Sequence, residues 1–138
     1  MIEFRPAELE DLVAVRRATP RRHFQKLTMQ IRDYPAWAIR SGEERLGLCG
    51  LAPIGSGVIE AWFLASTRLR HSPHRVAAMR ALMLRLATVL PNDLLICRIL
   101  EGHRAGERIA RLSGFLPIDE WLPGTRVRTW VRPPDAKT

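Results

Sequence analysis

Cysteine is scarce in this chain, which limits the chemistry that can hold it together. Only Cys49 and Cys97 occur among the 138 residues, and each lies in an apolar run typical of a strand. We expect two reduced, buried thiols, with neither a disulfide nor a metal pair, because no spacing matches a zinc site. A chain of this length buries a core without such cross-links. One domain is expected at 1–132, followed by a flexible tail at 133–138.

Long apolar runs are also absent. No stretch approaches the roughly 20 residues that cross a bilayer as a helix. The first residues, 1–5, include an acid and lack the apolar segment of a secretory signal. The composition, 46% hydrophobic and 26% charged, is ordinary for a folded protein. These observations predict a cytoplasmic protein with no membrane partner and no long disordered segment.

Lysine is almost missing from a strongly basic chain. Lys26 and Lys137 are the only lysines, so arginine supplies the other 20 of the 22 basic residues, and the formal net charge is +8. Arginine binds phosphates and carboxylates in a planar, bidentate way, which indicates an anionic partner such as nucleic acid, an acidic protein or a phosphate-bearing cofactor. A genome whose codons favour arginine over lysine explains the same composition. The count leaves both explanations open, so only clustered arginines are informative.

The pattern of apolar and polar residues predicts an α/β protein. The expected strands are 2–5, 36–40, 46–53, 58–66, 94–100, 116–121 and 127–132, and the expected helices are 8–18, 22–33, 76–90 and 105–112. The strand–helix–strand unit 58–100 implies parallel pairing through a right-handed crossover. The fold class is therefore a single domain with a mixed, mostly antiparallel sheet flanked by helices.

A basic turn joins strand 58–66 to the long helix that follows. The arginines and histidines of this turn are Arg68, Arg70, His71, His74 and Arg75. A helix start presents free backbone N–H groups and the positive end of the macrodipole, so a turn of this composition is suited to hold an anion. The sequence therefore predicts an anion-binding site at this turn.

The order of the elements and two short motifs resemble the GCN5-related N-acetyltransferase (GNAT) superfamily. The opening Ile2-Glu3-Phe4-Arg5-Pro6-Ala7 looks like the usual first strand, and Leu112-Ser113-Gly114-Phe115 looks like the end of the usual final helix. A glycine directly after a helix also suits a C-cap. The compact length is similar to that of small phage-encoded members. The resemblance implies transfer of an acetyl group from acetyl-coenzyme A to an amine.

In that family a loop of the form Gln/Arg-x-x-Gly-x-Gly/Ala cradles the coenzyme A pyrophosphate with its backbone amides. The backbone that would hold the pantetheine belongs to Leu64, Ala65 and Ser66. In the matching loop, 70–75, Arg70 fits the first position, but Pro73 and Arg75 replace the small residues. Proline has no N–H to donate, and arginine is bulky. Either the cationic side chains of the turn bind the phosphates instead, or cofactor binding has been lost.

The resemblance makes Glu60 the candidate general base, because GNAT enzymes often place a glutamate on the fourth strand. Its apolar neighbours predict partial burial, which suits a carboxylate for proton transfer. Exposure to solvent, or pairing with an arginine, is the structural alternative. The tyrosine that usually serves as general acid is replaced by Ala110, and the chain's only tyrosine is Tyr34. His103 and Ser113 are the candidate substitutes.

Three functions follow from these features. The first is an N-acyltransferase in which the amine attacks the thioester directly and Glu60 takes the proton. The second is a catalytically silent GNAT-like module that binds a protein partner, which agrees with the missing glycines and tyrosine. The third is a nucleic-acid-binding protein that uses its arginine surface. A homodimer through an exposed closing strand at 127–132 is also open.

Overall fold

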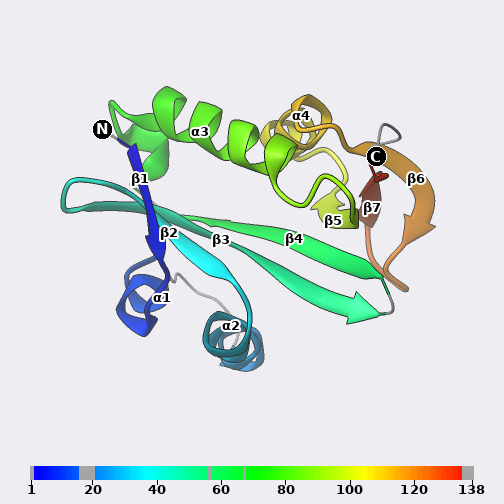
Figure 1. Cartoon of the computed structure of the whole chain (residues 1–138), viewed down its shortest axis with the longest axis horizontal. Helices are drawn as coiled ribbons and strands as arrows, with labels where there is room; N and C mark the ends of the chain where they lie inside the picture. Colours follow the sequence, from blue (N-terminus) through cyan, green and yellow to red (C-terminus); the bar gives the residue numbers. More distant parts are fainter. Residues whose placement is uncertain (1, 16–20, 56, 67, 135–138) are drawn as a thin grey trace. The chain divides into compact units, whose positions relative to one another are not determined.

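The described residues, 2–15, 21–55, 57–66 and 68–134, form seven strands that follow the order β1-β2-β3-β4-β5-β7-β6 in one sheet (Figure 1). In this computed structural model the strands are β1 (Ile2–Pro6), β2 (Ala36–Ser41), β3 (Glu44–Gly55), β4 (Val58–Ala65), β5 (Leu94–Leu100), β6 (Leu116–Trp121) and β7 (Val127–Arg132). The helices are α1 (Leu9–Val15), α2 (Arg21–Asp33), α3 (Arg75–Thr88) and α4 (Arg104–Leu112), with a short 3₁₀ turn at Leu69–His71.

The pairing of the strands confirms the predicted mixed, mostly antiparallel sheet. β1–β2, β2–β3, β5–β7 and β6–β7 are antiparallel, whereas β4 and β5 are parallel. The last three strands have the predicted bounds. The predicted helix 76–90 is shorter than expected, because it ends at Thr88 and Leu90 takes a left-handed conformation with φ 46°. The end of the predicted helix 8–18 and most of the predicted tail lie outside the described residues.

The chain divides into two units, and the boundaries between them fall within β3, β4 and α3. The first unit is Met1–Ala52 with Trp62–Ala78, and the second is Pro53–Ala61 with Met79–Thr138. Within the described part of the chain, no helix has both the length and the apolar character needed to span a bilayer.

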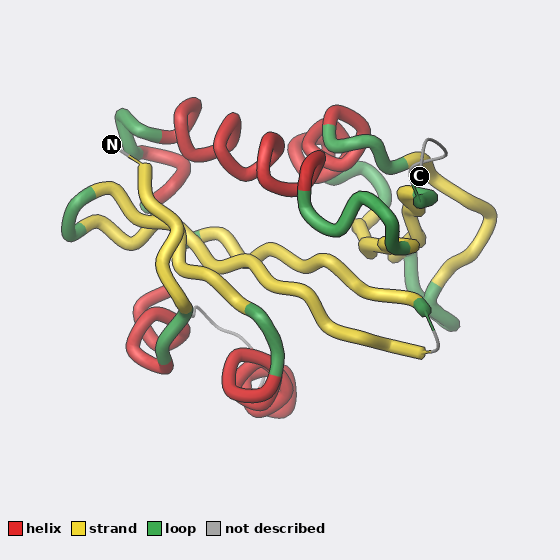
Figure 2. The backbone as a smooth tube through the Cα atoms, viewed as in Figure 1, coloured by secondary structure: helices red, strands yellow, loops and turns green. Residues whose placement is uncertain are grey.

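In the first unit, α1 and α2 cover one face of the antiparallel strands β1, β2 and β3 (Figure 2). The buried residues of this core are Leu12, Leu27, Ala38 and Leu48. They come from both helices and both strands of the hairpin, so burial of apolar surface holds the layers together. Gly50 on β3 is required by the packing, because a Cβ there would lie 2.5 Å from the ring of Trp62.

In the second unit, β7 lies between β5 and β6. Trp130 and Arg132 are two residues apart on β7 and therefore share one sheet face. Arg111 of α4 stacks over the Trp130 ring at 5.2 Å. Arg132 donates to carbonyl oxygens at the end of α3, namely Leu86 O, Val89 O at 2.6 Å and Leu90 O at 2.8 Å. Both helices thus pack on the same face of β7.

The prediction that strand 127–132 is an exposed edge is wrong. β7 is paired on both sides, with β5 and with β6. β6 is the outer strand of the sheet. Its pairing is irregular, with a register shift between Pro117 and Trp121. An irregular outer strand is less suited to adding a further strand from another chain.

Candidate active site

The basic turn begins at Ser66, directly after β4 in the first unit. Ser66 is buried at 5% exposure, and its N–H donates to Leu46 O at 2.9 Å. Its hydroxyl accepts the Arg68 N–H at 3.1 Å, and its carbonyl accepts the Leu69 N–H at 3.1 Å. Ser66 therefore anchors the turn to β3, and its polar groups are engaged in the fold. Of the other predicted pantetheine-contacting residues, Leu64 packs against the core and Ala65 is exposed.

The backbone amides of the turn are engaged within the turn itself. His71 donates to Arg68 O at 3.1 Å, and Ser72 donates to Leu69 O at 3.2 Å. His74 donates to the Ser72 hydroxyl at 3.1 Å, and the Arg75 N–H donates to the Ser72 carbonyl at 3.2 Å. Since these N–H groups already have acceptors, this turn does not offer the amide cradle that the GNAT resemblance implies.

The arginine and histidine side chains of the turn remain available. Those of Arg68, His71, His74 and Arg75 are exposed. The backbone of Arg70 lies in the 3₁₀ turn, and its side chain lies outside the described part of the structure. Helix α3 begins at Arg75, so the first-turn amides of Val76 and Ala77, which an α-helix leaves without intrahelical acceptors, also face the turn. The turn thus fits a phosphate through charged side chains and the helix start.

Glu60 lies on β4 in the second unit, at the end of the short ladder with β5. That ladder runs from Val58 opposite Leu94 to Glu60 opposite Ile96. The Glu60 side chain is 15% exposed, and its Oε2 lies 3.6 Å from Nη1 of Arg98. The expected partial burial is therefore confirmed, and so is the alternative in which Glu60 pairs with an arginine. Burial and the ion pair occur together at this residue.

Cys97 lies next to Arg98 on β5 and is a free, partly buried thiol. Burial raises its pKa from 9.0 to about 12, and the negative charge of Glu60 adds to the shift. The thiol therefore stays protonated at neutral pH and is a poor nucleophile. Cys49 likewise forms no disulfide, and it is buried as expected.

The two candidate substitutes for the missing tyrosine lie at opposite ends of α4. His103 is the exposed residue that precedes the helix, and its ring lies over Gly106, where a Cβ would be 2.4 Å from Nδ1. Ser113 is 2% exposed, and its hydroxyl donates to Ile109 O at 2.7 Å. Helix capping therefore explains Ser113. Ala110, at the tyrosine position, is buried.

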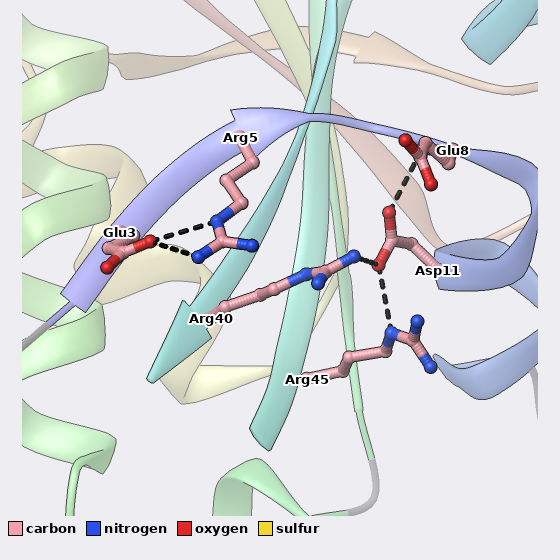
Figure 3. A network of polar contacts seen from close by, with 6 residues as sticks. All are labelled: Glu3, Arg5, Glu8, Asp11, Arg40 and Arg45. Carbon is pink, nitrogen blue, oxygen red and sulfur yellow. Dashed lines mark hydrogen bonds and ion pairs between the residues drawn. The ribbon is translucent and has the colours of Figure 1, made fainter. Parts of the chain in front are cut away.

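An acidic residue that the sequence analysis did not single out is the centre of a polar network in the first unit (Figure 3). Asp11, 1% exposed, accepts the Glu8 N–H at 2.9 Å, Arg40 Nη2 at 2.6 Å and Arg45 Nε at 3.0 Å. Arg40 and Arg45 lie opposite each other on the β2–β3 hairpin. The sequence held a signal for this network: an acid in the first turn of a predicted helix, and arginines beside the turn of a predicted hairpin. The network ties α1 to the hairpin.

The chain is similar to known proteins in its fold and not in its sequence. No family model and no curated protein matches the sequence. Among solved structures, an acetyltransferase from Streptococcus agalactiae is 18% identical, over 95% of this chain and 97% of that chain, with TM-score 0.65. A GNAT-family acetyltransferase from Bacillus cereus is 11% identical, over 97% and 98%, with TM-score 0.69. A spermidine/spermine N-acetyltransferase from Vibrio cholerae is 13% identical, over 94% and 91%, with TM-score 0.62. At these identities the likeness shows the fold: nearly the whole chain adopts the fold of GNAT acetyltransferases.

Proposed function

We propose that this protein is an acyl-coenzyme A-dependent N-acyltransferase that acetylates an amine. The observation that carries the proposal is the exposed cationic turn at the start of α3, in a chain with the fold of acetyltransferases. Arg68 and Arg75 would hold the phosphates of the cofactor by charge and by hydrogen bonds, and the His71 and His74 rings would add hydrogen bonds. The helix start adds its dipole to the same site.

The chain's own residues would supply binding and proton transfer. When bound, acetyl-coenzyme A supplies the activated thioester. Glu60 is the proposed general base, which takes a proton from the amine nitrogen, because it is a shielded carboxylate on β4. Cys97 stays protonated and takes no part in the transfer. His103 is the remaining candidate for a general acid, because its ring is exposed while Ser113 is buried.

Thermal denaturation with and without acetyl-coenzyme A tests the proposal. A ligand that binds only the folded form stabilises it by about 2.7 kcal/mol at about 100 times its Kd. We expect a clear rise in Tm for the unmodified chain and none for Arg68→Ala with Arg75→Ala. The matched control is Arg32→Ala with Arg126→Ala, which removes the same charge from two exposed ion pairs and should keep the shift. No shift in the unmodified chain would refute cofactor binding. An unchanged shift in the Arg68/Arg75 variant would refute the placement of the phosphates.

The engaged amides of the turn, with Pro73 and Arg75 in place of small residues, favour a second candidate. This is a catalytically silent module that binds a protein partner, and it is the function left if acetyl-coenzyme A produces no shift. The likeness to small phage-encoded proteins belongs to this candidate and stays a prediction. Short duplex DNA in the same assay tests nucleic-acid binding, which would give a shift that falls steeply with added salt.

A further inference from the structure

We propose that Arg98 binds the carboxylate of the acceptor, so that the amine substrate is an α-amino acid. This inference rests on the proposed acyl transfer and names its acceptor class. The contact that carries it is the ion pair between Arg98 and Glu60, two side chains of the second unit that carry opposite charges next to each other. Such a pair is complementary to a zwitterion, whose ammonium group would contact Glu60 and whose carboxylate would contact Arg98.

Strand register places the pair on one sheet face together with a third polar side chain. Glu60 lies opposite Ile96, and Arg98 follows two residues later on the same side of β5. Thr129 on β7 lies opposite Arg98. Opposite residues of an antiparallel pair share a face, so Thr129 belongs to the same polar row. The neighbouring residues Trp130 and Arg132, which contact α4 and α3, point from the other face of β7.

The polar groups of this row are incompletely paired. Glu60 Oε2 and Arg98 Nη1 are 3.6 Å apart, which is longer than a hydrogen bond. Arg98 Nε and Thr129 Oγ1 are buried and find no hydrogen-bond partner among the described residues. A guanidinium group has five N–H donors, and a buried polar row left in this state is costly in a purely structural role. The Arg98 side chain is 28% exposed, so part of it is accessible to a ligand.

Net charge argues against a polycationic acceptor. The chain carries a formal charge of +8, and Arg98 adds a positive charge directly beside the proposed base. A polyamine would be repelled by both, whereas an α-amino acid carries its own anion on the carbon that bears the amine. The carboxylate would therefore offset Arg98 while the amino group reaches Glu60.

The test compares amino acids with the same amines lacking the carboxylate. Purified protein with acetyl-coenzyme A is offered L-leucine and isoamylamine, L-phenylalanine and phenethylamine, and spermidine, and release of the coenzyme A thiol is followed. We expect the amino acid of each pair to have the higher kcat/KM, and spermidine to be poor. Arg98→Met should raise KM for the amino acids by roughly 10- to 100-fold more than KM for the decarboxylated amines, the value of a lost charge-assisted hydrogen bond to the carboxylate. Arg98→Lys, which keeps the charge, should show a smaller rise.

The possible outcomes separate this inference from the proposed function. If spermidine or the decarboxylated amines react as well as the amino acids, the acceptor class is wrong while acyl transfer stands. The same conclusion holds if Arg98→Met weakens both members of each pair equally. If acetyl-coenzyme A gives neither a thermal shift nor thiol release with any amine, both proposals fail. As a measurement without turnover, L-leucine with free coenzyme A should raise the Tm of the unmodified chain, raise it less for Arg98→Lys and leave it unchanged for Arg98→Met. No rise for the unmodified chain would also contradict the inference.

Discussion

Arg132 is expected to be the single most important polar side chain for the stability of the second unit. It is 7% exposed and comes from β7, yet its guanidinium donates to three carbonyl groups at the end of α3. The carbonyl of Leu86 is one of the last four of the helix, and those of Val89 and Leu90 lie just beyond it. Carbonyl groups at a helix end have no intrahelical N–H donors. Its positive charge also meets the negative end of the helix dipole. Arg132 thus replaces a helix cap supplied by neighbouring residues.

The size of the effect can be worked out from these contacts. Each hydrogen bond from a charged donor contributes about 1.5–3 kcal/mol, and the three are not additive because they share one group. Burial lowers the pKa of Arg132, with a nearby Asp93 opposing the shift, so desolvation offsets part of the gain. We expect Arg132→Met to lower the free energy of unfolding by about 3–5 kcal/mol, a large part of the roughly 5–15 kcal/mol typical of a domain.

Urea denaturation followed by circular dichroism measures this loss. With an m-value of about 2 kcal/mol per molar urea, the midpoint should fall by roughly 2 M. Arg132→Lys should fall in between, because a lysine keeps the charge but cannot reach three carbonyls with a planar group. The control is Arg111→Met, which removes only the exposed stacking on Trp130 and should cost less than about 1 kcal/mol. If Arg132→Met costs no more than this control, the capping argument is wrong.

Two further predictions concern buried groups outside the turn. Asp11→Asn leaves Arg40 and Arg45 without their shared counter-charge and should lower the free energy of unfolding by about 3 kcal/mol, measured by urea denaturation. Asp33→Asn, at an exposed ion pair, is the control and should change little. Equal effects of the two substitutions would contradict the proposed role of the network. Because the pKa of Cys97 is raised from 9.0 to about 12 on folding, the unfolded chain loses this proton first, and stability should fall with rising pH between these values. Reaction of the Cys97 thiol with a thiol reagent should accordingly be slow in the folded protein at pH 9 and fast in urea, and fast labelling of the folded chain would refute the assignment.

Local signals in the sequence were enough for most of the architecture. Gly114 ends α4 with φ 96°, and the N–H of Phe115 bonds back to Ala110 O at 2.9 Å, as a glycine after a helix predicts. The bounds of β5 follow from an apolar run, and those of β6 and β7 from the Pro123-Gly124 turn that joins them. The position of the basic turn between β4 and α3 also follows from the chain order. Each of these features depends on residues close together in the sequence.

The candidate site was only partly predictable. Glu60 could be named from its place on β4, but Arg98 and Thr129 become its companions only through the register of β4 with β5 and of β5 with β7. The engaged amides of the turn were equally hidden, because Ser66 and Ser72 accept N–H groups only in one particular backbone conformation. A pattern of residue types does not determine either arrangement.

Sequence alone determined the elements, their order and the cationic turn, because helix and strand patterns, caps and turns are set by neighbouring residues. Tertiary structure alone decided which charges meet. Asp11 lies 29 and 34 residues from Arg40 and Arg45, and Arg132 lies 46 residues from the carbonyl of Leu86. Contacts over such separations depend on how strands align and which face of each strand a helix covers. A shift of one residue in the register of its strand would point Arg40, Arg45 or Arg132 to the opposite face.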